Sequence, residues 1–140
     1  TIIDASGAKG LKYTSYNLFE LEKIHRRFPD LKLYNGHDEV MLNALPIGID
    51  GAIGSTFNVM APKYIALKKM FEKGDMKTAT AMQGEINDII EVMIKAGVNA
   101  SIKYWLAKAG IPCGNCRKPF APVSPEYAKL LDEYYSKVME

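Results

Sequence analysis

The first 58 of the 140 residues alternate between patterns typical of β-strands and patterns typical of α-helices. Residues 9–14 and 31–35 are short strand-like segments, and residues 50–55 form a third, which is small, apolar and rich in glycine. A single helical pattern separates each strand from the next. Parallel strands need crossover helices of this kind, so the order favours an α/β layer or barrel over a β-sandwich.

Helices are expected both between these strands and after them. Asn17 is placed to cap a helix that stops at Pro29, and residues 38–45 carry a second helical pattern. From Pro62 onward the chain is expected to be helical apart from one loop. Four helices are predicted in that part, over residues 63–73, 75–97, 99–109 and 124–138.

Composition and charge limit the classes of function. A content of 48% hydrophobic and 24% charged residues suits one globular domain, and basic residues are interspersed with acidic ones at a formal charge of +2. This pattern gives no nucleic-acid footprint. The chain has no run of about 18 apolar residues and no signal-peptide pattern at its start. We therefore expect a cytoplasmic protein that binds neither nucleic acid nor membrane.

The two cysteines, Cys113 and Cys116, lie in a predicted loop. A thioredoxin-like dithiol would stand between a strand and a helix start, and proline-containing segments flank this pair instead. A zinc site needs two further ligands, and His25 and His37 lie in unrelated segments. We expect two incidental thiols and no bound metal, with a disulfide or a metal or redox role as the alternatives.

Lys12, in the first predicted strand, is a candidate for imine formation. An amine attacks a ketone only when it is neutral, so a pKa of about 10.4 must be lowered by burial or by nearby cations, and a barrel interior does this. The protonated imine then withdraws electrons, so that a carbon–carbon bond one atom further away breaks. Thr14 has the same strand face and is placed near the imine. An exposed or snorkelling lysine is the plain alternative.

Polar residues follow the next two strands, where the loops of a barrel form its reactive rim. Asp38 and Glu39 follow Gly36, and Ser55 follows Gly54. The three side chains are suitable acceptors for a hydroxylated substrate, and the glycines let main-chain groups approach it. The plain alternative for the first loop is a turn with an acidic helix cap, and for the second an ordinary strand-end turn.

The chain resembles the C-terminal half of the N-acetylneuraminate lyases, within the superfamily of pyruvate-dependent class I aldolases that also contains dihydrodipicolinate synthase. The resemblance implies a partial (β/α)8 barrel in residues 1–73, made of strands six to eight with their helices, and a three-helix extension in residues 74–140. It covers residues 10–140 and rests on four segments, 10–14, 33–39, 50–58 and 116–120.

The resemblance also implies an activity and a site. The activity is cleavage of N-acetylneuraminate to N-acetylmannosamine and pyruvate, with a covalent imine and no separate cofactor. Lys12 would be the Schiff-base lysine on the sixth barrel strand, with Thr14 beside it. The remaining implied residues bind the polyhydroxyl tail of this sugar acid, and they are Asp38, Glu39 and Ser55, with Gly36 and Gly54 through their main chains.

Part of the implied site belongs to the first half of the barrel. In this family a Ser/Thr-Thr loop holds the pyruvate carboxylate, and a tyrosine from the fifth strand transfers the proton. Residues 1–9 match neither, and the chain starts at Thr1 rather than at a methionine. Three strands cannot close an eight-stranded barrel. We therefore expect a half-barrel that works with a complementary N-terminal chain, or one piece of a longer lyase.

Three alternatives remain open from the sequence. The chain is also compatible with a related keto-acid aldolase, with a dihydrodipicolinate synthase-like enzyme, or with a catalytically incomplete half-barrel that serves in assembly. Intact members of the family are typically tetramers, so a homo-oligomer is expected as well.

Overall fold

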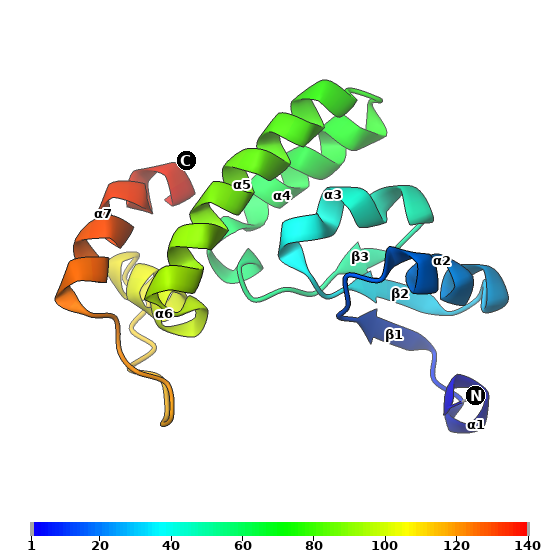
Figure 1. Ribbon diagram of the computed structural model, residues 1–140, viewed down its shortest axis with the longest axis horizontal. Helices are drawn as coiled ribbons and strands as arrows, with labels where there is room; N and C mark the ends of the chain where they lie inside the picture. Colours follow the sequence, from blue (N-terminus) through cyan, green and yellow to red (C-terminus); the bar gives the residue numbers. More distant parts are fainter. Residues whose placement is uncertain (1, 140) are drawn as a thin grey trace.

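The computed structural model describes residues 2–139, in which three strands form one parallel sheet with helices packed beside it (Figure 1). Lys12 is paired with Tyr34, and Asn35 with Ala52. The predicted α/β arrangement with a parallel sheet is confirmed. Because the strands are parallel, their carboxyl ends lie along the same edge. The strands, in sheet order, are β1 (Gly10–Tyr13), β2 (Lys32–Asn35) and β3 (Gly51–Ala52).

Helices make up most of the described chain. None of those within residues 2–139 is both long and apolar enough to cross a membrane. In Figure 1, α4 and α5 form a long pair, and α6 and α7 lie at the end of the molecule away from the sheet. The α-helices are α1 (Ile2–Ser6), α2 (Leu18–Arg27), α3 (Met41–Ala44), α4 (Phe57–Glu72), α5 (Met76–Ala96), α6 (Val98–Lys108) and α7 (Pro125–Met139).

Local capping sets several of these boundaries as predicted. The Asn17 side chain accepts a hydrogen bond of 3.1 Å from the Glu20 N–H and begins α2. At the start of α5, Asp75 accepts one of 3.0 Å from the Thr78 N–H. Each side chain satisfies a backbone donor that has no partner within its helix.

The structure differs from the prediction around two prolines. The helix expected over residues 38–45 is divided into a 3₁₀ turn η1 (Asp38–Val40), the short α3 and a second 3₁₀ turn η2 (Leu45–Ile47), which holds Pro46. Helix α4 begins at Phe57, six residues before the predicted start, because a kink with φ −125° and ψ 15° at Met60 admits Pro62. The short α1 was not predicted.

Two separate cores hold these elements. The smaller core lies between α2 and the sheet, where Leu21 and Leu33 are fully buried. The larger core joins α3 to α4, α5, α6 and α7, and its fully buried Trp105 donates a hydrogen bond of 3.0 Å from Nε1 to the Leu131 carbonyl. The loop that follows β2 therefore lies between the sheet and a helical body with a core of its own.

Candidate active site

Lys12 and Thr14 meet the end of the neighbouring strand at Gly36. A Cβ atom at Gly36 would lie 2.0 Å from Thr14 Oγ1 and 3.0 Å from Lys12 Cε, so no larger residue fits here without movement of these side chains. The Gly36 N–H donates a hydrogen bond of 2.8 Å to the Tyr13 carbonyl. The structure thus places these three predicted residues together at the carboxyl edge of the sheet.

The surroundings of Lys12 are open. Its side chain is exposed, although the barrel interior expected from the sequence would bury it. The physical reason lies in the sheet: within residues 2–139, β1 pairs on one side only, with β2. Three strands form a wall rather than an enclosure, so groups that would desolvate the amine have to come from beyond these residues.

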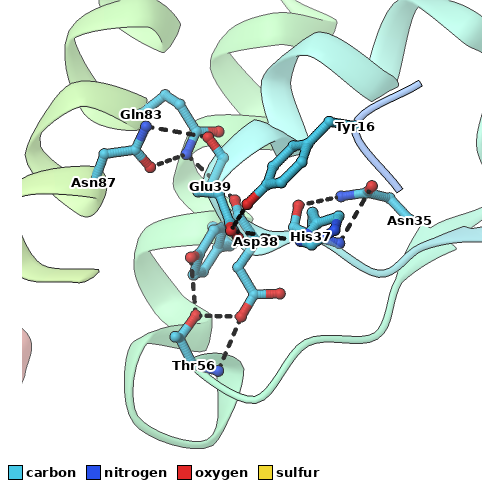
Figure 2. Close-up of polar contacts among 9 residues, drawn as sticks. Tyr16, Asn35, His37, Asp38, Glu39, Thr56, Gln83 and Asn87 are labelled. Atoms are coloured by element: carbon cyan, nitrogen blue, oxygen red, sulfur yellow. Dashed lines mark hydrogen bonds and ion pairs between the residues drawn. The ribbon is translucent and has the colours of Figure 1, made fainter. Parts of the chain in front are cut away.

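Asp38 has the opposite environment, since its side chain is 5% exposed. Its Oδ2 accepts a hydrogen bond of 2.9 Å from the Thr56 N–H and one of 2.6 Å from Thr56 Oγ1 (Figure 2). The other oxygen, Oδ1, is buried without a hydrogen-bond partner in the described chain. A Cβ atom at Gly54 would lie 1.3 Å from this oxygen, so the carboxylate occupies the space that any side chain at Gly54 would need.

Glu39 lies beside Asp38 but is held at the surface by aromatic side chains. The Tyr16 hydroxyl donates a hydrogen bond of 2.6 Å to Glu39 Oε1, and His37 Nδ1 lies 3.4 Å from the same oxygen. The Tyr16 and His37 rings stack with their centroids 4.1 Å apart and 12° between their planes. Figure 2 shows Tyr16 reaching across to Glu39. The loop after β1 and the loop after β2 are thereby joined.

These contacts change the pKa of the Glu39 carboxyl. Partial burial acts to raise this pKa, but the Tyr16 hydrogen bond, a backbone hydrogen bond and the neighbouring His37 outweigh it, so the pKa lies below its ordinary value. The same hydrogen bond to Glu39 raises the pKa of the Tyr16 hydroxyl. Glu39 is therefore an ionised acceptor, and Tyr16 is a protonated donor, near neutral pH.

Two amide side chains of α5 hold the backbone of the loop that carries both carboxylates. Gln83 accepts a hydrogen bond of 3.0 Å from the Leu42 N–H and donates one of 3.3 Å to the Asp38 carbonyl. Asn87, one turn further along α5, donates a hydrogen bond of 3.1 Å to the Glu39 carbonyl. Gln83 also donates to Asn87 Oδ1 at 2.9 Å. The helical body thus fixes the main chain beneath both carboxylates.

Ser55 lies at the same edge of the sheet, in the turn that leads into α4. Its side chain is exposed, and its carbonyl accepts a hydrogen bond of 2.8 Å from Asn58 Nδ2. Ser55 stands between Gly54 and Thr56, and these two neighbours are the residues that contact the Asp38 carboxylate. The two predicted glycines have a steric reason to be glycine, because each leaves room for a neighbouring polar side chain.

Several residues that organise this site were not predicted from the sequence. Thr56 directly follows Ser55, and its hydroxyl could have been proposed from the Gly-Ser-Thr segment alone. Gln83 and Asn87, two polar residues four apart within the apolar pattern of α5, were a second sign that this helix contacts a polar loop. His37 is partly buried and stacks against Tyr16. The unpredicted residues are Tyr16, His37, Thr56, Tyr64, Gln83 and Asn87.

The cysteine loop lies outside this site. Cys113 and Cys116 are free thiols, the first exposed and the second partly buried. In the described range 2–139, no group of three or more His, Cys, Asp or Glu side chains is arranged to hold a metal ion.

Comparison with known proteins identifies the family. The model of the Dihydrodipicolinate synthetase family matches residues 2–137. This chain belongs to that family. Its α/β fold is therefore of the TIM-barrel type, and the family includes the class I aldolases that the sequence resembled.

Relatives that match this family member include N-acetylneuraminate lyases. That of Enterobacter sp. (strain 638) is 41% identical over 142 residues, which are 99% of this chain and 47% of the relative. The structure of the lyase from Fusobacterium nucleatum superimposes with a TM-score of 0.90 at 29% identity, over 99% of this chain and 48% of that one. The chain thus spans about half the length of the relatives it matches.

Two further similar structures concern a ligand and a catalytic residue of those proteins. The Fusobacterium nucleatum lyase is known in complex with pyruvate, with a TM-score of 0.85 at 31% identity over 92% of this chain and 44% of that one. A Ruminococcus gnavus sialic acid aldolase is known as a catalytic lysine mutant, with a TM-score of 0.89 at 25% identity over 96% of this chain and 46% of that one.

Proposed function

We propose that this chain is the lysine-bearing half of an N-acetylneuraminate lyase. In this proposal β1, β2 and β3 are strands six to eight of a (β/α)8 barrel. Residues 1–73 belong to the barrel, and residues 74–140 form a C-terminal helical extension. The observation that carries the proposal is that Lys12 and the buried Asp38 meet one edge of a parallel sheet in a member of this family.

Lys12 supplies the nucleophile in the proposed reaction. Its neutral amine adds to the C2 ketone of the open-chain sugar acid, and loss of water leaves a protonated imine. The C3–C4 bond then breaks, its electrons move into an enamine, and the C4 hydroxyl loses its proton as N-acetylmannosamine leaves. Protonation at C3 and hydrolysis of the imine release pyruvate and restore the lysine. No cofactor other than this covalent link takes part.

The rest of the proposed site follows from the polar groups at the same edge. Thr14 lies beside Lys12, within reach of the imine. The hydroxylated tail of the substrate lies over the Asp38 loop, where carboxylate oxygens accept hydrogen bonds from its hydroxyls, and Ser55 borders it. The main chains of Gly36 and Gly54 contact the same tail. The tail contacts then supply binding energy at a distance from the bond that breaks.

A complementary N-terminal half-barrel completes the site in this proposal, in the same polypeptide or in a second one. Strands β1 and β3 each have one edge without a pairing strand among the described residues. A hollow of about 220 Å³ lies at the β3 side, lined by apolar groups of β3 and α4 that include Ala52 and Phe57. The missing strands would cover these edges, desolvate Lys12 and bring the groups that bind the pyruvate carboxylate and transfer the proton. Assembly of such barrels into a homo-oligomer belongs to the same proposal.

Release of pyruvate from N-acetylneuraminate tests the proposal. The experiment uses the completed barrel, meaning this chain joined to, or mixed with, the N-terminal half of a lyase. Lys12→Arg should abolish turnover, because a guanidinium does not form the imine, while Lys9→Arg should leave it unchanged. Turnover of N-acetylneuraminate by the Lys12→Arg variant would contradict the proposal.

Substrate preference separates this proposal from a related keto-acid aldolase. N-acetylneuraminate should be cleaved with a higher kcat/KM than a 2-keto-3-deoxy sugar acid with a shorter tail, and Asp38→Asn should reduce that preference. A chain that prefers the shorter acid would be a different aldolase of the same family. A completed barrel without activity on either would be the assembly module.

A further inference from the structure

The carboxylate of Asp38 has one satisfied oxygen and one that has no donor. Oδ2 receives both the N–H and the hydroxyl of Thr56, whereas Oδ1 is buried without a partner among residues 2–139. A buried charged oxygen without a donor is costly, and native structures rarely leave one. Any donor for Oδ1 would therefore come from outside residues 2–139.

The hydrogen bonds behind Asp38 have only one consistent direction. Thr56 Oγ1 lies 2.6 Å from Asp38 Oδ2 and 2.9 Å from the Tyr64 hydroxyl. An ionised carboxylate only accepts, so the single hydroxyl proton of Thr56 points to Asp38. Tyr64 must then donate to Thr56, and burial, which raises the pKa of the Tyr64 phenol, keeps that proton in place.

Burial restricts the movement of the three hydrogen-bonded side chains, Asp38, Thr56 and Tyr64. Asp38, Thr56 and Tyr64 are 5%, 3% and 3% exposed, so water does not compete for their hydrogen bonds. Phe57 packs edge-on against the Tyr64 ring, with the ring centroids 4.4 Å apart and 82° between the planes. The phenol therefore cannot turn freely away from Thr56.

We infer that Tyr64 and Thr56 are positioning residues that orient Asp38, so that Oδ1 is the oxygen that accepts a hydrogen bond from a hydroxyl of the substrate tail. The inference rests on the proposed function and adds two residues to it, neither of which contacts the substrate. Tyr64 acts only through Thr56, and Thr56 acts only through Asp38. Because Oδ1 can only accept, the group recognised must be a hydrogen-bond donor, and in the tail of the proposed substrate that donor is a hydroxyl.

The condensation direction separates tail binding from imine chemistry, because pyruvate has no tail and N-acetylmannosamine supplies all of it. Hydrogen bonds to charged groups contribute about 1.5–3 kcal/mol, which corresponds to about 10- to 100-fold in binding. In the completed barrel, Thr56→Val should raise the KM for N-acetylmannosamine by this factor. The KM for pyruvate and kcat should change by less than about twofold, since the lost interaction is equal in the ground and transition states.

The direction of the chain predicts a non-additive pair of substitutions. Tyr64→Phe should raise the KM for N-acetylmannosamine by only a few fold, because Thr56 keeps its own bond to Asp38. In the Thr56→Val background, Tyr64→Phe should have no further effect, since the phenol has already lost its acceptor. Thr56→Ser keeps the hydroxyl and should restore a KM within about threefold of the wild type.

A matched control and an integrity check accompany these variants. Tyr104→Phe removes a hydroxyl that is hydrogen-bonded to Asp132 at 2.8 Å on the far helices, and it should change neither KM. Formation of the borohydride-trapped pyruvate adduct at Lys12 reports an intact barrel in every variant. If Thr56→Val does not fold, the test uses Tyr64→Phe and Thr56→Ser in its place.

The outcomes are distinct. Failure of the wild-type completed barrel to form the pyruvate adduct would overturn the proposed function and the inference with it. A wild type that forms the adduct, with variants that raise both KM values equally or that lower stability alone, would overturn the inference only. Additive effects of Thr56→Val and Tyr64→Phe would show that Tyr64 does not act through Thr56, which also contradicts it.

Discussion

Lys12 and Asp38 lie along the same edge of one sheet, but their surroundings are opposite. Asp38 is buried, its Oδ2 receives two donors from Thr56, and its backbone is held from α5. Lys12 is exposed and stands on a strand that pairs on one side only within residues 2–139. The acceptor region, meaning the loop with Asp38 and Glu39, is therefore organised by contacts within the described residues. In the proposed function, the lysine region, meaning Lys12 and Thr14, would depend on groups outside them. Under the proposed function, binding of the substrate tail and imine formation can be disturbed separately, and the following substitutions are designed to do so.

The largest effect on the acceptor region is expected from Gly54→Ala. The new methyl group would lie 1.3 Å from Asp38 Oδ1, and that carboxylate is buried and cannot move into solvent. We expect a loss of about 1–3 kcal/mol in the free energy of unfolding, as for other overpacked sites, together with a large rise in the KM for N-acetylmannosamine. Denaturant unfolding and condensation kinetics measure the two effects.

Gly84→Ala is the matched control for this substitution. Gly84 lies inside α5, and a Cβ atom there would meet nothing within 4 Å. Replacing a mid-helix glycine with alanine should stabilise the protein by about 0.5–1 kcal/mol. Equal changes in stability at Gly54 and Gly84 would show that the Asp38 contact does not restrict the backbone at Gly54.

A smaller effect, on the lysine region, is expected from Gly36→Ala. The added methyl group would lie 2.0 Å from Thr14 Oγ1 and 3.0 Å from Lys12 Cε. Thr14 is exposed and is able to rotate away, so the loss of stability should be smaller than at Gly54. Displacement of the lysine should slow pyruvate trapping by borohydride and leave the affinity for N-acetylmannosamine nearly unchanged. The reverse pattern would break the separation between the two regions.

The smallest effect is expected from Tyr16→Phe, which removes the hydroxyl that donates to Glu39. This hydrogen bond keeps the pKa of Glu39 below its ordinary value despite partial burial. A carboxyl with a lowered folded-state pKa stabilises the fold above its unfolded-state pKa of about 4.3 and loses that contribution as the pH falls through the folded-state value. The variant should therefore be less stable than the wild type above about pH 4.3, and this difference should shrink as the pH falls through the folded-state pKa of Glu39.

Thermal unfolding of both proteins between about pH 3 and pH 6 measures this difference in the pKa of Glu39. Tyr104→Phe is a comparison variant, because its hydroxyl helps to lower the pKa of another carboxyl, Asp132, far from the sheet. The exposed position of Tyr16 limits the expected change in stability to about 1 kcal/mol. An unchanged pH dependence in Tyr16→Phe would show that the hydroxyl does not control ionisation of Glu39.

The sequence was sufficient for those features that depend on local pattern. The alternation of strands and helices, the cap at Asn17, and the grouping of Lys12 with Asp38 at one edge all follow from spacing and side-chain chemistry. The steric reason for Gly54 was not accessible, because it depends on where an aspartate 16 residues earlier places its oxygen.

Contacts between distant segments account for what the sequence did not reveal. Tyr16 reaches Glu39 across 23 residues, and Asn87 reaches the same loop across 48. Neither residue belongs to a short motif, and tyrosine and asparagine are common in loops and on helices. The kink at Met60 lets Pro62 lie inside α4, so the helix begins earlier than the proline alone suggests. Only the folded arrangement selects these residues.

The most direct test of the central claim is borohydride trapping with pyruvate, followed by peptide mapping, on the completed barrel and on this chain alone. We expect the adduct on Lys12 in the completed barrel and much less on the isolated chain, where Lys12 is exposed and the proposed pyruvate-binding groups of the first half-barrel are absent. The exposed Lys9 nearby should remain unlabelled in both. Absence of an adduct on Lys12 in the completed barrel, or equal labelling of Lys9 and Lys12, would contradict the account.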